Sequence, residues 1–148
     1  MSEPGPYLHA TAVLVAEGAV LIRGASGAGK SQLALALIAE ARRCGLFTRL
    51  IGDDRVAVSL AGGRALVRGH PVLAGRIEER ATGILMGASE VAGVLRCVVD
   101  LNAAPPRLPE NEAQLAILEG VSLPNLTIWT GCAPQEGARR ILAFLNWV

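Results

Sequence analysis

The residues with the clearest chemical meaning lie together at positions 24–31, Gly-Ala-Ser-Gly-Ala-Gly-Lys-Ser. This is a complete G-x-x-x-x-G-K-[ST] phosphate-binding loop, in which glycines let successive backbone N–H groups face one anion. Lys30 supplies a positive charge for the β- and γ-phosphates, and Ser31 is placed to reach Mg²⁺. An apolar stretch, Ala19–Ile22, precedes the loop and a helical pattern follows it, which disfavours a chance glycine-rich turn. The predicted nucleotide-binding residues are Gly24, Ala25, Ser26, Gly27, Ala28, Gly29, Lys30 and Ser31.

Two adjacent carboxylates, Asp53 and Asp54, follow the apolar stretch Phe47–Gly52. A carboxylate at a strand end beside bound phosphates can hold Mg²⁺ through water or accept a proton from an attacking hydroxyl. Neighbouring residues of a strand point to opposite faces, so we expect the two aspartates to have different tasks. Taken alone, the pair fits an Asx turn at a polar strand end equally well. The phosphate-binding loop makes the functional interpretation the better one.

Composition and charge limit the classes of protein to which the chain can belong. The 148 residues suit a single domain over 1–148, with 1–6 as a loose end. A net charge of +1 without a basic stretch predicts no nucleic-acid or membrane partner. The N-terminus lacks the pattern of a signal peptide, and the 3 cysteines lack metal-ligand spacing. These features predict a cytoplasmic protein.

Strand patterns outnumber helical patterns along the chain. This predicts an α/β fold with a mixed or mostly antiparallel sheet, a helix after the loop and a C-terminal helix, rather than alternating βαβ units. The stretch Pro71–Thr82 gives no clear pattern. The expected helices are Gln32–Arg43 and Gln135–Trp147, and the expected strands are Ala10–Ala16, Gly18–Arg23, Phe47–Gly52, Val56–Leu60, Arg64–Arg68, Leu95–Leu101, Gln114–Leu118 and Asn125–Thr130.

Two segments carry a resemblance to a known family. The stretch from Leu8-His9 through the loop to Ile51-Gly-Asp-Asp-Arg-Val56, and the stretch Ile77–Ile84, resemble the catalytic domain of HPr kinase/phosphorylase. The resemblance implies a P-loop fold related to phosphoenolpyruvate carboxykinase. It also implies transfer of the γ-phosphoryl group of ATP to a serine of HPr, a small carrier protein of a phosphotransferase system. The chain looks like the short, single-domain type found in alphaproteobacteria.

The resemblance also implies roles for individual residues. ATP phosphates bind to the loop, and Ser31 and Glu78 ligate Mg²⁺. Asp54 matches the family's acceptor of the serine proton, with Asp53 beside it. His9 matches an active-site histidine of the family.

The chain departs from the family pattern at several points. Ala25 stands where the loop often carries an acidic residue, and a Gly-Arg-Asn segment is replaced by Gly131-Cys132-Ala133. Arg107 is a hypothetical substitute for the family's arginine. Longer members have further N- and C-terminal parts, so we expect forward transfer rather than efficient reversal, and we leave a homo-oligomer open. One alternative function is a regulatory module that binds ATP and a partner protein without phosphoryl transfer. Another is a small-molecule kinase or generic ATPase, which predicts an arginine-rich lid that the sequence does not clearly show.

Overall fold

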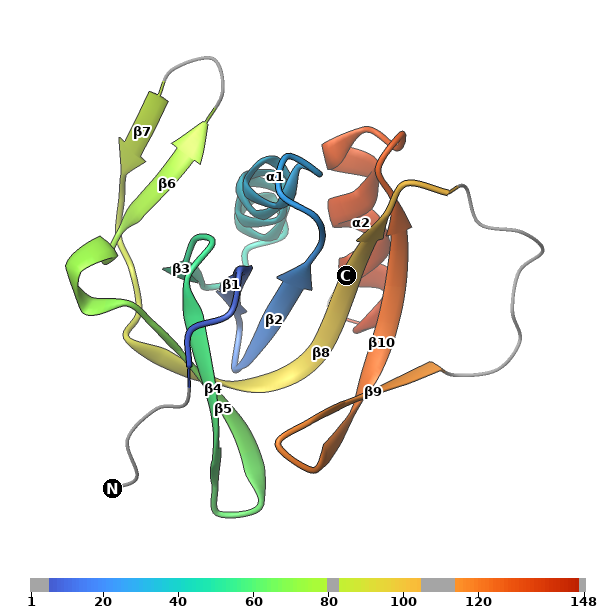
Figure 1. The fold of residues 1–148 in the computed structure, drawn as a ribbon. Helices are drawn as coiled ribbons and strands as arrows, with labels where there is room; N and C mark the ends of the chain where they lie inside the picture. Colours follow the sequence, from blue (N-terminus) through green and yellow to red (C-terminus); the bar gives the residue numbers. More distant parts are fainter. Residues whose placement is uncertain (1–5, 80–82, 105–113, 147–148) are drawn as a thin grey trace.

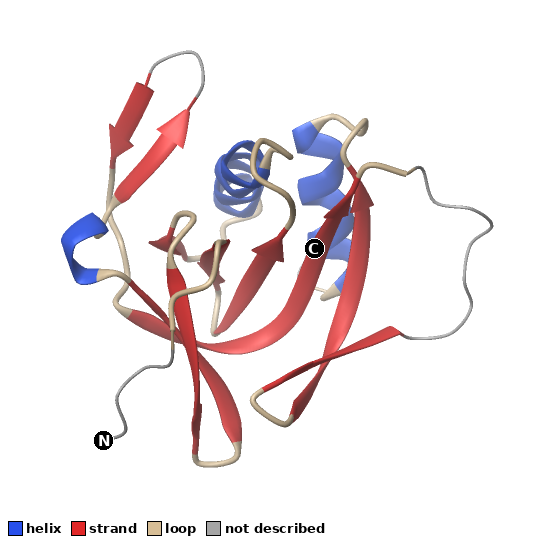
Figure 2. Ribbon diagram, in the orientation of Figure 1, coloured by secondary structure: helices blue, strands red, loops and turns tan. Residues whose placement is uncertain are grey.

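The structure is a computed structural model that describes residues 6–79, 83–104 and 114–146. This part of the chain contains ten strands, two α-helices and one short 3₁₀ helix, η1 (Figures 1 and 2). In chain order they are β1 (Ala10–Val15), β2 (Gly18–Arg23), α1 (Lys30–Arg43), β3 (Thr48–Gly52), β4 (Val56–Ala61), β5 (Arg64–Gly69), η1 (Pro71–Leu73), β6 (Arg76–Glu79), β7 (Gly83–Met86), β8 (Ala92–Asn102), β9 (Gln114–Leu118), β10 (Val121–Trp129) and α2 (Pro134–Phe144).

Eight strands form one mixed sheet. Its main order is β3-β1-β2-β8-β10-β9, and the β4–β5 hairpin joins it where β5 pairs with the start of β8. The pairings β2–β8 and β8–β10 are parallel, and the other pairings of this sheet are antiparallel. Strands β6 and β7 form a separate antiparallel hairpin. The structure therefore confirms the predicted α/β fold with a mixed, mostly antiparallel sheet.

Both helices cover one face of the sheet (Figure 1). Two apolar cores lie on the two faces of the sheet. The side chains of each strand alternate between these cores, because successive side chains of a strand point to opposite faces. On β2, for example, Val20 and Ile22 belong to the core under the helices, whereas Leu21 belongs to the core on the opposite face. Leu37 of α1 and Ile141 of α2 are fully buried in the helix-side core. The two cores therefore pack against both faces of β2, the strand that leads into the phosphate-binding loop.

Helix α1 begins directly at the loop. Gly29 precedes its first residue with φ of 102°, a left-handed conformation that favours glycine. At the other end, Gly45 has a left-handed φ of 76° and its N–H donates to the carbonyl of Arg42, which ends the helix. Helix α2 starts with Pro134, whose ring suits a first helical turn.

The element boundaries differ from the sequence-based expectation in a few places. Strand β8 begins at Ala92 rather than Leu95, because its first residues pair with β5. The stretch without a clear pattern contains η1 and β6, and β6 pairs with β7. The expected loose end lies largely outside the described residues, and Arg107 lies outside them altogether. No helix in the described part is both long and apolar enough to cross a membrane.

Candidate active site

The phosphate-binding loop is shaped by its glycines and closed by Lys30. Gly27 and Gly29 have φ of 80° and 102°, left-handed conformations that let the loop turn tightly, and the N–H of Ala28 between them donates to the carbonyl of Ala25 over 3.0 Å. The Lys30 side chain is buried, and its Nζ donates hydrogen bonds to the carbonyls of Gly24 (3.0 Å) and Ala25 (3.3 Å). The ammonium group therefore lies against the loop backbone. No side chain of the described residues caps α1 at Gly29, which leaves the helix N-terminus available to an anion.

Asp53 accepts two hydrogen bonds on one carboxylate oxygen. Ser31 Oγ donates to Asp53 Oδ1 over 2.7 Å, and Thr11 Oγ1 donates to the same oxygen over 2.9 Å. Thr11 comes from β1 and is fully buried, whereas Ser31 lies in the first turn of α1. Asp53 follows the last residue of β3. The Asp53 carboxylate thus links Ser31 of the loop to β1, through Thr11, and to the end of β3.

Asp54 has different partners from Asp53. Its backbone N–H donates to Thr11 Oγ1 over 3.2 Å, and its φ of 60° is left-handed. Its carboxylate lies 3.8 Å from Lys30 Nζ and 3.8 Å from His9 Nδ1, and 58% of its side chain is exposed. Asp54 therefore lies between a buried cation and the solvent, where a group on a second protein could reach it.

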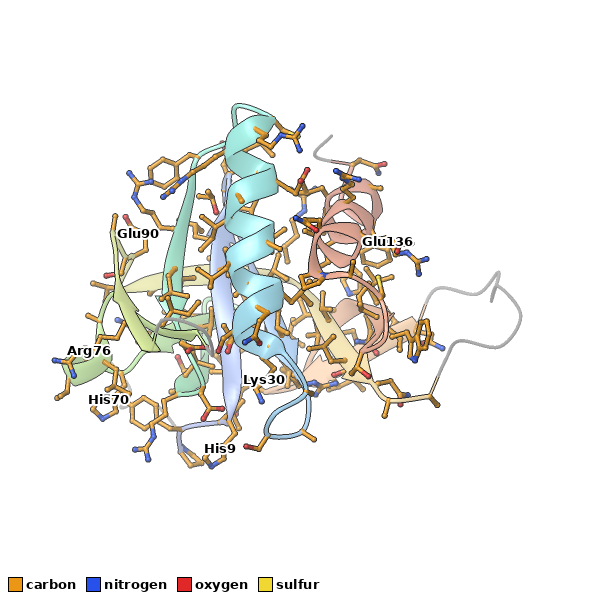
Figure 3. All side chains as sticks on the ribbon, turned by 90° about the horizontal axis from the view of Figure 1, so that it is seen from above. His9, Lys30, His70, Arg76, Glu90 and Glu136 are labelled. Carbon is orange, nitrogen blue, oxygen red and sulfur yellow. The ribbon has the colours of Figure 1, made fainter. Side chains whose placement is uncertain are left out.

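A cavity of about 250 Å³ connects these groups. It is lined by Ser26, Gly27, Gly29, Lys30, Ser31, Gln32, Asp53 and Asp54. Figure 3 labels His9 and Lys30 near one another at the end of the molecule where α1 begins. The structure thus brings most of the sequence-predicted site residues to a single place.

An ion pair supports the strand that leads into the loop. Arg23, the last residue of β2, donates two hydrogen bonds to the carboxylate of Asp100 on β8, over 2.8 and 3.0 Å. Asn125 of β10 donates to the same carboxylate over 3.0 Å. Partial burial raises the pKa of Asp100, but the hydrogen bonds and charge of Arg23 and the bond from Asn125 outweigh it and lower the pKa. Asp100 therefore stays ionised and ties three parallel strands together beside Gly24.

Two predicted groups lie outside the part of the chain that the structure describes, and one group that the structure does show was missed. Glu78 lies on β6, where its backbone pairs with Ile84, but its side chain and Arg107 lie outside the described part. Sequence reasoning gave no role to Thr11. The available signal was weak: a hydroxyl residue within an otherwise apolar strand, two positions after His9.

The oxygen ligands present fit a magnesium ion that is bound mainly by a nucleotide. In the described residues no group of three or more His, Cys, Asp or Glu side chains could hold a metal ion alone. Mg²⁺ at nucleotide sites typically takes one or two protein oxygens, and phosphates and water supply the rest. The hydroxyl of Ser31 and the carboxylate of Asp53 lie 2.7 Å apart and supply such oxygens.

Known proteins resemble this chain in sequence. The family described as HPr Serine kinase C-terminal domain matches residues 4–97. HPr kinase/phosphorylase of Mycoplasma mycoides subsp. mycoides is 41% identical over 76 residues, which cover 51% of this chain and 22% of that protein. HPr kinase/phosphorylase of Treponema pallidum is 33% identical over 139 residues, which cover 84% of this chain and 41% of that protein. The chain thus spans less than half the length of these curated relatives.

A solved structure supports the fold independently. The Hpr(Ser) kinase/phosphatase from Coxiella burnetii superimposes with a TM-score of 0.74 at 21% sequence identity. The match covers 96% of this chain and 99% of that one. At this level of identity the similarity concerns the fold alone.

Proposed function

The chain belongs to the family of the HPr Serine kinase C-terminal domain, and on that premise we propose that it is an ATP-dependent kinase that phosphorylates a serine of an HPr-like carrier protein. The observation that carries this proposal is the position of Asp54. Its exposed carboxylate lies 3.8 Å from the buried Lys30 ammonium group, at a cavity lined by the phosphate-binding loop. A proton acceptor beside a phosphate site is what a hydroxyl-phosphorylating enzyme requires.

The side chains divide the chemistry between them. Asp54 accepts the proton of the serine hydroxyl while the serine oxygen forms a bond to the γ-phosphorus of ATP and the bond to the β–γ bridging oxygen breaks. Lys30 and the loop N–H groups stabilise the negative charge that shifts onto the departing ADP. His9, which lies 3.8 Å from Asp54, orients its carboxylate.

Magnesium would be held by Ser31 and Asp53, and Glu78 is proposed as a further ligand. When bound, the ion spreads the charge of the transferred phosphoryl group. The short bond from Ser31 to Asp53 supports a shared role for these two residues. Since Thr11 fixes the same oxygen of Asp53, the orientation of that carboxylate is set before a metal ion arrives.

The proposal is tested by incubating the chain with Mg²⁺, radiolabelled ATP and a purified HPr-like carrier. We expect label on a serine of the carrier, and no label when that serine is replaced by alanine. Lys30→Ala should abolish transfer, because it removes the cation from the phosphate site. Nucleotide binding without any transfer to the carrier would contradict the kinase proposal.

That result would favour the second candidate, a regulatory module that senses nucleotide. The observation in its favour is the turn Gly131-Cys132-Ala133, which stands where the family carries an arginine. A missing cation weakens stabilisation of the transferred group more than it weakens binding of ATP. A sensor would bind the carrier with an affinity that changes with nucleotide, and calorimetric titration of the carrier with and without ATP measures that change.

A further inference from the structure

The two edges of the main sheet, β3 and β9, are protected differently (Figure 1). The outer side of β3 is partly closed, because the N–H of Glu90 donates to the carbonyl of Leu50 over 2.9 Å and Leu50 forms a bridge with Ser89. Strand β3 also carries a charged residue, Arg49. In the described part of the chain, only β10 pairs with β9. The backbone of β9 can therefore serve as a template for another strand.

The side chains of β9 make its edge apolar. The strand reads Gln-Leu-Ala-Ile-Leu and carries none of the charges by which edge strands avoid association. Ala116 and Leu118 pack into the core opposite the helices. Leu115 and Ile117 point to the other face, but they are 62% and 69% exposed. Pro124 of β10 lies opposite Leu115 and is also exposed, so an apolar strip runs along this edge.

We propose that β9 pairs with β9 of a second copy of this chain, so that the two main sheets become one continuous sheet. A two-fold axis relates the copies of a closed dimer, and identical edge strands that meet across such an axis run antiparallel. With the axis at Ala116, Leu115 of each copy lies opposite Ile117 of the other. The exposed apolar side chains then cover each other. This inference does not depend on the proposed function, because β9 does not line the cavity at Lys30.

The charge pattern of β9 selects a second copy as the occupant. Like charges directly opposite each other destabilise a strand pair, whereas apolar pairs stabilise it. Since β9 has no charged residue, self-pairing brings no like charges together. A strand of 5 residues buries less than the roughly 800 Å² per partner of a standard interface. We therefore expect a weak dimer, with a dissociation constant of about 10–100 μM.

Sedimentation of the chain over a range of about 1–500 μM measures this association. We expect a shift from monomer to dimer. Ile117→Lys should raise the dissociation constant about tenfold or more, because it places a charge in the apolar contact. Leu60→Lys is the matched control, since Leu60 is 53% exposed but lies on the β4–β5 hairpin. Circular dichroism checks that both variants remain folded.

Two results of that experiment would overturn the proposal. A chain that stays monomeric throughout the range would exclude a second copy as the occupant and leave the edge to a strand of a different protein. Equal dimerisation of Ile117→Lys and Leu60→Lys would show that the copies associate through another surface.

A mixture of two variants tests the antiparallel register itself. Leu115→Glu and Ile117→Lys should each weaken self-association. In the mixed dimer, the new carboxylate of one copy lies opposite the new ammonium group of the other, so the mixture should associate about fivefold more tightly than either variant alone. Fluorescence anisotropy with one labelled variant measures the affinity of the mixed dimer. A mixture that associates no better than the single variants would contradict the pairing of residue 115 with residue 117.

Discussion

At the scale of single residues, the hydroxyl of Thr11 is shared by both aspartates. It donates to the Asp53 carboxylate and accepts from the Asp54 backbone N–H. One buried group thus fixes the proposed metal-binding carboxylate and the left-handed backbone that carries the proposed proton acceptor. We infer that Thr11 is a positioning residue.

Thr11→Val should therefore lower kcat more than it raises the KM for ATP. Valine has nearly the same shape, but it leaves Asp53 less constrained and the Asp54 N–H without its partner, at a cost of about 1–3 kcal/mol. Steady-state kinetics measure the effect, and Thr11→Ser is the control that should restore kcat. If both variants have the same kcat, the hydroxyl does not position the aspartates.

Asp54→Asn should retain ADP binding and lose phosphoryl transfer. The amide has nearly the same size but cannot accept the serine proton, and general-base catalysis contributes about 10²–10⁴-fold in rate. Single-turnover assays with labelled ATP measure transfer, and calorimetry measures binding. A variant that transfers at a near-normal rate would show that another group accepts the proton.

The site residues differ in how far the sequence could identify them. The loop is a continuous motif whose backbone geometry follows from its glycines, so Lys30 and Ser31 could be assigned directly. The sequence predicted different environments for Asp53 and Asp54, and they do have different partners. The reason given for it, alternation along a strand, is wrong, because both residues follow the end of β3 and Asp54 has a left-handed φ of 60°. Thr11 could not be found this way, because its partners are 42 and 43 positions away in the chain.

At the scale of elements, the parallel strands β2, β8 and β10 are joined by Arg23, Asp100 and Asn125 next to the loop. The pKa of Asp100 is lowered in the folded state, so its ionised form stabilises the fold at neutral pH. This contribution is complete above the unfolded pKa of about 3.9. The stabilising contribution is lost as the pH falls through the lower pKa that Asp100 has in the folded state.

Asp100→Asn should therefore destabilise the chain by about 1 kcal/mol at pH 7, a value reduced for solvent screening because both side chains are about a third exposed. The difference from the wild type should shrink below a pH of about 4, where the wild-type carboxyl also becomes neutral. Urea unfolding at neutral and acid pH measures both values. A difference that is constant with pH would show that the charge of Asp100 contributes nothing.

Elements with strong local patterns were the ones that the sequence predicted best. Strands β2 and β9 have the predicted bounds, since each is a short run with clear turn residues around it. The start of β8 and the pairing of β6 with β7 depend on partners distant in sequence or on stretches without periodicity. Local pattern carries no information about such partners, so these features required the structure.

At the scale of the whole molecule, the strands β2 and β8 each contribute to both cores. Leu21 and Val98 belong to the core opposite the helices, whereas Ile22 and Val99 belong to the core beneath them. A change in either core therefore reaches the other through shared strands. We propose that residues 1–148 unfold as a single domain.

This proposal predicts one cooperative transition even when a single core is weakened. Leu37→Ala, beneath the helices, should cost about 2–5 kcal/mol, and Val67→Ala, in the opposite core, about 2 kcal/mol. Both side chains are fully buried, whereas Leu60 is 53% exposed, so Leu60→Ala should change stability by less than about 0.5 kcal/mol. Circular dichroism and tryptophan fluorescence should give coincident urea curves for every variant. Separate transitions, with Val67→Ala shifting only one of them, would show that the two cores unfold independently and that the single-domain proposal is wrong.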